Sequence, residues 1–231
     1  MRVCTVGDWE RCTKSLKPHR INVHRELVNC IENYLHDGRI LEVGAQTGVD
    51  AEYISRLGYN VISVDYNGEA INMMRQRKIN AIIKADGLDL PFADASFDLV
   101  YSQGLVEHFI GSELDQLLEE QIRVIRPNGY LLIDVPNLIS LNTIPKRILI
   151  AFNKWIVPWE REFGAWQLKE LGESKGLSFI ESYAWGYDPY IGERLRKLGF
   201  LLFGERLLSL EKSRGQYFMK AIGALFQKDD S

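Results

Sequence analysis

The chain has 231 residues, of which 46% are hydrophobic and 26% charged, a composition ordinary for a globular protein of about one α/β domain. Its formal net charge of −3 argues against a dedicated nucleic-acid binder, because such proteins carry a basic surface. The sequence shows no signal peptide and no apolar run of about 18 residues that would span a membrane. With Cys4, Cys12 and Cys30 as reduced thiols, we expect a cytoplasmic protein.

Apolar strands alternate with amphipathic helices over residues 20–136, whereas residues 1–19 show no such pattern and are expected to be irregular. The expected helices cover residues 20–36, 48–58, 68–78 and 112–127, with Ser112 as the N-cap of the last. The expected strands cover residues 39–42, 60–65, 81–86, 96–102 and 130–135. This alternation predicts an α/β fold with a mostly parallel sheet.

Beyond residue 136 the spacing predicts two more strands, which complete a seven-stranded sheet, and two insertions. The strands are expected at 177–185 and 217–226, the helices at 145–155 and 166–175, and a helical insertion at 188–212. We expect one domain over 1–231, with an N-terminal helical cap (1–37), a cofactor-binding core (38–136), cap insertions (137–165 and 188–212), and a last strand and tail (213–231).

The most informative segment, RILEVGAQTG over residues 39–48, reads as a strand that turns through two glycines into a helix. A dinucleotide site would have the pattern G-x-G-x-x-G, but Gln46 and Val49 occupy the places of the second and third glycines. Glu42 lies two residues before Gly44, where a carboxylate would repel phosphate and would suit a cationic cofactor. The segment therefore indicates a nucleoside cofactor other than a dinucleotide.

Acids also end the next two strands. Asp65 lies about 20 residues past the glycine turn, where α/β nucleotide-binding proteins hold a ribose. Its two oxygens match two vicinal hydroxyls. Asp86 ends the following segment. Polar residues at the carboxyl ends of parallel strands predict a ligand crevice along that edge.

Four motifs occur together in the order LEVGAQTG, VISVDYN, KADGLDLPFADASFDLVYS and RVIRPNGYLLIDVPN. Over residues 38–137 they resemble the class I S-adenosylmethionine-dependent methyltransferases, in particular the small-molecule type 11 family. The resemblance implies a Rossmann-like doubly wound sheet with an antiparallel last strand. It also implies S-adenosylmethionine as cofactor and methyl transfer to a small molecule. The family usually has glycine where this chain has Gln46.

The resemblance also implies roles for single residues. Glu42 would lie near the charged methionine end of the cofactor, where the backbone amides of Ala45 and Gln46 would approach it. Asp65 would hold the ribose, and Asp86 would accept from the adenine amino group. The other expected contacts are Gly44, Gly48, Tyr66, Gly87, Leu88 and Gln103; for Tyr66, a place on the adenine face and a solvent-facing side chain are equally supported.

Glu107-His108 is the candidate catalytic pair. His108 would act as a general base, or the pair would only orient the loop before the next helix. Relatives that methylate phenolic quinone precursors bind a divalent metal through a Glu-x-x-Glu-His run. The first position of that run falls on Gly104, so no metal is expected.

Aromatic and basic residues gather in the second half of the chain. Two interpretations apply to four tryptophans, Trp155, Trp159, Trp166 and Trp185. They would line a substrate pocket of apolar or aromatic character, or they would pack in the core of the cap, which is the favoured interpretation for any one of them. Residues 146–155 and 194–203 are basic and amphipathic, which suits peripheral membrane contact, although cap packing or a dimer contact is favoured. The sequence leaves the oligomeric state open.

Three other functions compete with a small-molecule methyltransferase. They are a non-catalytic S-adenosylmethionine-binding protein on the same fold, a tRNA-modifying methyltransferase and an NAD-linked enzyme. The net negative charge disfavours a tRNA-modifying enzyme, and the absence of the G-x-G-x-x-G pattern disfavours an NAD-linked enzyme.

Overall fold

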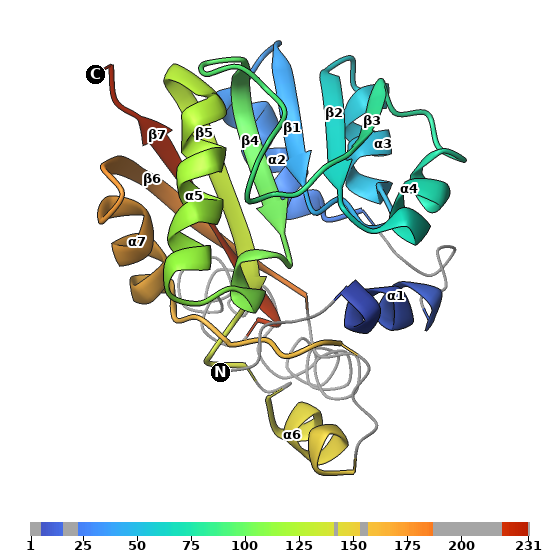
Figure 1. Ribbon diagram of the computed structural model, residues 1–231. Coiled ribbons are helices and arrows are strands. Elements are labelled where there is room, and N and C mark those ends of the chain that lie inside the picture. The colour runs from blue at the N-terminus through green and yellow to red at the C-terminus, as the bar shows by residue number, and fades with distance from the viewer. Residues whose placement is uncertain (1–5, 16–22, 141–142, 153–156, 187–218, 231) are drawn as a thin grey trace, which may run out of the picture.

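The computed structural model describes residues 6–15, 23–140, 143–152, 157–186 and 219–230. Seven strands form one sheet with helices on both faces (Figure 1), which confirms the predicted α/β class. Among the described residues, no helix has both the length and the apolar character needed to cross a membrane. The predicted insertion over 188–212 lies outside the described residues, as do Trp155 and Cys4.

The sheet has the strand order β3-β2-β1-β4-β5-β7-β6. Its strands are β1 (Arg39–Val43), β2 (Asn60–Asp65), β3 (Ala81–Lys84), β4 (Phe97–Gln103), β5 (Ile125–Pro136), β6 (Leu177–Trp185) and β7 (Ala221–Lys228). Strands β1 to β5 pair in parallel, whereas β7 runs antiparallel to both β5 and β6. The antiparallel last strand implied by the resemblance is confirmed. The strand order reverses between β1 and β4, and such a switch point opens a ligand crevice at the carboxyl edge.

Side chains alternate along each strand between two apolar layers. Leu41 and Val100 pack with helices α5 (Ser112–Val124) and α7 (Ala165–Glu173) on one face of the sheet. Ile40 and Leu99 pack with α2 (Arg25–Tyr34) and α3 (Val49–Arg56) on the other. The remaining helices are α1 (Val6–Ser15), α4 (Gly68–Met74), α6 (Thr143–Ala151) and the short 3-10 turn η2 (Val106–His108). Figure 1 shows α1 and α6 beyond the carboxyl ends of the parallel strands.

The N-terminal segment differs from the prediction. Residues 1–19 were expected to be irregular, but α1 occupies Val6–Ser15. Cys12 and Thr13 are buried on the side of α1 that faces α4 and the carboxyl edge of the sheet. The helix is short, so its contacts with the rest of the protein, more than its own propensity, account for its stability.

Several element boundaries also differ, for example those of α5, α4 and β5. Ser112 is the first residue of α5 and makes no capping bond; Gly111, with φ of 59°, holds the N-cap position. Helix α4 ends at Met74 instead of continuing to residue 78, because Arg77 turns back and donates to Glu52 on α3 at 2.8 Å. Strand β5 begins at Ile125, because a bend over 126–129 keeps both of its arms paired with β4.

Helix α7 packs against β7 through Gly172. A Cβ atom at Gly172 would overlap the ring of Phe226, which is fully buried. Gly172→Ala is therefore expected to lower the free energy of unfolding by about 1–3 kcal/mol, as measured by urea denaturation.

The matched control is Gly68→Ala at the first residue of α4, where a Cβ atom would meet nothing within 4 Å. Its stability should be unchanged or slightly higher. Equal losses in the two variants would contradict the packing described for α7.

Candidate functional site

A cavity of about 780 Å³ lies at the carboxyl ends of the parallel strands, within the size range of small-molecule sites. Nine of the twelve predicted site residues line it. They are Gly44, Gln46, Asp65, Tyr66, Asp86, Gly87, Leu88, Gln103 and His108. The cavity thus joins the ends of β1, β2 and β4 with the loop after β3, as the order of the strands requires.

Asp65 fixes the turn that follows β1. Its Oδ2 atom accepts a hydrogen bond from the backbone amide of Gln46 at 2.9 Å, and its Oδ1 atom accepts one from the amide of Asn67 at 2.8 Å. Burial raises the pKa of this carboxyl group, while the amide bonds oppose the shift. Each carboxylate oxygen has a second lone pair, so both can still accept from a ligand.

The turn itself adopts a left-handed conformation at two positions. Gly44 has φ of 77° and Gln46 has φ of 46°. A residue with a side chain costs about 1–2 kcal/mol in this conformation, whereas glycine adopts it freely. Gln46 therefore takes the backbone geometry that a glycine would have, and the hydrogen bond to Asp65 helps to hold it there.

Three predicted residues, Glu42, Ala45 and Gly48, do not line the cavity. The amide of Ala45 donates to the carbonyl oxygen of Val64 at 3.1 Å. The amide of Gln46 is likewise used, by Asp65. The expectation that these two amides face a ligand is therefore corrected, because both stabilise the turn.

Gly48 and Glu42 lie behind the cavity wall. A Cβ atom on Gly48 would come within 2.8 Å of Met74, and φ of 65° favours glycine there. Glu42 is buried, and its Oε2 atom accepts from the hydroxyl of Ser63 at 2.8 Å. Burial, with a smaller contribution from Asp50, raises the pKa of Glu42 to about 8.

The loop after β3 closes one end of the cavity. The Oδ1 atom of Asp86 accepts from the amide of Leu88 at 3.0 Å, which folds the loop into a tight turn. A Cβ atom on Gly87 would come within 3.0 Å of Leu117 and 3.2 Å of Val43, so a larger residue would strain this wall. The turn presents Asp86 and Leu88 to the same cavity as Asp65.

The other end of the cavity is rich in acids. Asp134, on β5, is buried, and its Oδ2 atom accepts from the indole nitrogen of Trp185 at 2.6 Å. Burial raises the pKa of Asp134 to about 7. Glu107, Glu160 and Glu162 line the same end.

His108 lies in η2 and is almost fully buried. Its Nδ1 atom is 2.7 Å from the carbonyl oxygen of Trp159, and a carbonyl can only accept, so Nδ1 carries a proton. Burial lowers the pKa of His108 to about 4, although carbonyl contacts, including that of Gly104, oppose the shift. The imidazole is therefore neutral at physiological pH and a weak proton acceptor.

Several lining residues were not predicted. Trp9, Cys12 and Thr13 come from α1, and their i, i+3, i+4 spacing was a usable signal. Asp134 follows the same pattern of acids near strand ends as Asp65. By contrast, Lys146 and Glu160 lie in segments without a recognisable motif, and only the fold brings them to the cavity.

The described tryptophans of the second half of the chain lie in different environments. Trp185 lines the cavity, whereas Trp159 and Trp166 are 37% and 53% exposed. Of the described tryptophans in this half, only Trp185 contributes its ring to the pocket wall.

Comparison with known proteins agrees with this architecture. Residues 41–133 match the model of a methyltransferase domain. Over these residues the chain is similar to the class I S-adenosylmethionine-dependent methyltransferases. The family's cofactor is S-adenosylmethionine, as a relative's name also states: a probable S-adenosylmethionine-dependent methyltransferase of Mycolicibacterium smegmatis is 32% identical over 139 residues, which is 60% of this chain and 51% of that protein.

Two further relatives have names that point to different acceptors. A fatty-acid O-methyltransferase of Mycolicibacterium smegmatis is 35% identical over 99 residues, covering 41% of this chain and 35% of that protein. A probable tRNA methyltransferase 9B of Mus musculus is 28% identical over 153 residues, covering 63% and 32%. The chain thus spans about half or less of the length of these curated relatives.

The fold likeness extends further than the sequence likeness. The crystal structure of an S-adenosylmethionine-dependent methyltransferase from Archaeoglobus fulgidus superposes with a TM-score of 0.60 at 22% identity. The match covers 88% of this chain and 92% of the other. The methyltransferase fold therefore reaches well beyond residues 41–133.

The buried acid Glu42 makes stability depend on pH. Its pKa is about 8 in the folded state and near 4.5 when unfolded, so the folded state binds the extra proton. This contribution is fully present below about pH 4.5 and is lost as the pH rises through about 8. The ligand-free protein should lose at least about 1 kcal/mol of unfolding free energy between about pH 5 and about pH 8 in urea titrations.

Glu42→Gln should flatten that dependence, because the amide keeps an acceptor for Ser63 without a charge. Glu32→Gln, at an exposed position of α2, is the control and should behave like the wild type. If the unfolding free energy of Glu42→Gln varied with pH as steeply as that of the wild type, this result would contradict the protonated state inferred for Glu42.

Proposed function

We propose that this protein transfers the methyl group of S-adenosylmethionine to a small-molecule acceptor. The observation that carries the proposal is the extent of the cavity at the carboxyl ends of the parallel strands. It reaches from Asp65 and Asp86 on one side to Asp134 and Glu160 on the other. The first side suits an adenosine, and the second leaves space in which an acceptor would meet the methyl group.

The cofactor would lie across the switch point of the sheet. Asp65 would accept from the ribose hydroxyls, and Asp86 would accept from the adenine amino group. Tyr66 and Leu88 would pack on the adenine. Gly44 and Gln103 lie between the two sides of the cavity, so they would line the methionine portion.

We further propose that the chain forms one domain whose peripheral segments cap the cavity. Trp9 and Thr13 of the segment 1–37 line the cavity, as do Lys146, Leu149 and Glu160 of the segment 137–165. These residues support the assignment of both segments as a cap around the core at 38–136. A cap that excludes water favours group transfer, because water competes with the acceptor.

The lining favours a small acceptor over a nucleic acid. Four acids, Glu107, Asp134, Glu160 and Glu162, face the acceptor side, where Lys146 and Lys220 are the basic side chains among the described lining residues. Such a wall offers few basic contacts to the phosphates of an RNA backbone. Apolar residues on the same side of the cavity, among them Leu149, support an apolar or aromatic acceptor.

The free thiols of Cys12 and Cys30 agree with the proposed cytoplasmic location.

The chain's main contribution to catalysis would be positional. The cofactor, when bound, supplies an already activated methyl group on its sulfonium. Asp65 and Asp86 would fix the adenosine, and the acidic end of the cavity would orient the acceptor toward it. Such positioning contributes up to about 7–11 kcal/mol to rate enhancement. A catalytic role for His108 stays a prediction, and its lowered pKa makes it a weak base.

Replacing Asp65 tests the cofactor placement. Asp65→Asn should weaken the binding of S-adenosylhomocysteine by at least about tenfold in titration calorimetry, because an amide cannot accept from both ribose hydroxyls while serving two backbone amides. Asp89→Asn, in the nearby loop and outside the cavity, is the matched control and should bind as the wild type does. Unchanged affinity of a folded Asp65→Asn would place the ribose elsewhere.

The overall activity is tested by incubating the full chain with S-adenosylmethionine and a panel of hydroxylated, amine and fatty-acid acceptors. Formation of S-adenosylhomocysteine, followed by mass spectrometry, should depend on one class of small acceptor. Binding of the cofactor without turnover would favour a non-catalytic binding protein. Salt-dependent binding and methylation of transfer RNA would favour the tRNA-modifying alternative.

A further inference from the structure

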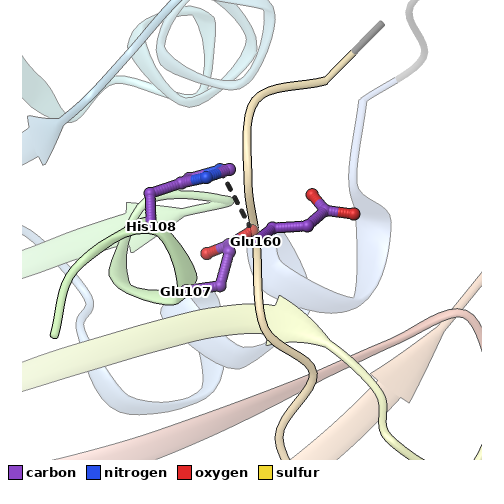
Figure 2. A group of neighbouring side chains, drawn as sticks. All are labelled: Glu107, His108 and Glu160. Atoms are coloured by element: carbon purple, nitrogen blue, oxygen red, sulfur yellow. Dashed lines mark ion pairs between the residues drawn. The ribbon is translucent and has the colours of Figure 1, made fainter. Parts of the chain in front are cut away.

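We propose that Glu107, His108 and Glu160 bind one divalent metal ion at the acceptor end of the cavity. Each residue offers one ligand atom, and these atoms lie within 4.8 Å of one another. Figure 2 shows Glu107 and His108 side by side on one turn, with Glu160 entering from a separate segment. No metal was expected from the sequence, because Gly104 stands at the first ligand position of the Glu-x-x-Glu-His run. In the structure, Glu160 offers a third ligand from a distant part of the chain.

The backbone holds the two segments together. The amide of Arg161 donates to the carbonyl oxygen of Glu107 at 3.1 Å. The imidazole of His108 donates to the carbonyl oxygen of Trp159 at 2.7 Å. These bonds flank Glu160 on both sides, so its place beside Glu107 and His108 is set by the main chain.

Glu107 provides an independent sign of a ligand. Its side chain is 2% exposed, and its Oε2 atom has no hydrogen-bond partner among the described residues. A buried carboxyl oxygen without a partner costs about 1–3 kcal/mol, so proteins seldom keep one without a use. A metal ion between Glu107 and Glu160 would satisfy this oxygen.

His108 has the arrangement of a metal-binding histidine. Such residues commonly donate one ring N–H to a carbonyl, which fixes the tautomer and directs the other nitrogen toward the metal. Here Nδ1 donates to Trp159, and Nε2 lies 3.8 Å from Oε1 of Glu107. A metal would use Nε2.

Lys146 allows the charges to balance. Its ammonium group lies 2.7 Å from Oε1 of Glu160 and 2.6 Å from Oε1 of Glu162. With a divalent ion present, Lys146 pairs with Glu162, while Glu107 and Glu160 contribute two negative charges and His108 none. The ion and its ligands are then neutral as a group, which a buried site requires.

Two carboxylates and one imidazole suit Mn²⁺ or Zn²⁺ better than the thiol-seeking metals. Three protein ligands leave further coordination positions open toward the cavity. On the proposed methyl-transfer function, an acceptor hydroxyl would bind there and lose its proton more readily. Solvent water would take that proton, so the lowered pKa of the bound hydroxyl would remove the need for a strong base, which His108 does not provide.

The test uses Mn²⁺ alone with the full-length chain, followed by electron paramagnetic resonance. The wild type should bind one Mn²⁺ with a dissociation constant below about 1 mM, and pulsed spectra should show coupling to an imidazole nitrogen. Glu107→Gln and Glu160→Gln should each weaken binding at least about tenfold. Glu113→Gln, an acid of the same cavity outside the cluster, should bind as the wild type does.

Absence of Mn²⁺ binding up to about 1 mM, or binding without nitrogen coupling, would overturn the proposal. So would folded Glu107→Gln and Glu160→Gln variants that retain wild-type affinity. Circular dichroism identifies a misfolded variant, in which case the nitrogen coupling of the wild type decides. S-adenosylhomocysteine calorimetry on the same wild-type sample separates failure of the metal site from failure of the cofactor assignment.

Discussion

The hydrogen bonds that Asp65 accepts from the turns after β1 and β2 are the constraint on which the site depends. One carboxylate at the end of β2 accepts from Gln46 on one side and from Asn67 on the other. It thereby stabilises the left-handed backbone conformation of Gln46, which precedes α3. It also links the end of β2 to the turn that follows the neighbouring parallel strand β1. We expect that without these two hydrogen bonds the turn after β1 would change conformation, and that the cavity wall at the switch point would change with it.

Buried acids in the cavity wall and directly behind it divide into two kinds. Glu42 and Asp134 have raised pKa values of about 8 and about 7, each for the same first reason, burial. Each accepts a hydrogen bond from a neighbouring side chain, Glu42 from Ser63 and Asp134 from Trp185. Glu107 and Glu160 instead converge with His108 beside Lys146. This cluster distinguishes the proposed acceptor end of the cavity, where a metal ion would bind. At the proposed cofactor end, Asp65 and Asp86 would instead accept hydrogen bonds from the neutral hydroxyl and amino groups of the cofactor.

The sequence was a good guide to the sheet and to the residues that meet at its carboxyl edge, and a poor one to the segments that lie beyond that edge. The acids that end β2 and the loop after β3 could be found because a parallel sheet gathers strand ends in one place. The inward turn of the Ala45 amide could not, since it depends on pairing with Val64 across the sheet. Glu160 was equally hidden, because its place beside Glu107 depends on long-range backbone bonds rather than on a local motif.

The most direct test of this account is a crystal structure grown with S-adenosylhomocysteine. The account predicts the adenosine between Asp65 and Asp86, with both ribose hydroxyls on the Asp65 carboxylate and the sulfur directed toward Asp134 and Glu107. A nucleoside bound elsewhere, or a cavity that stays empty at saturating ligand, would contradict it.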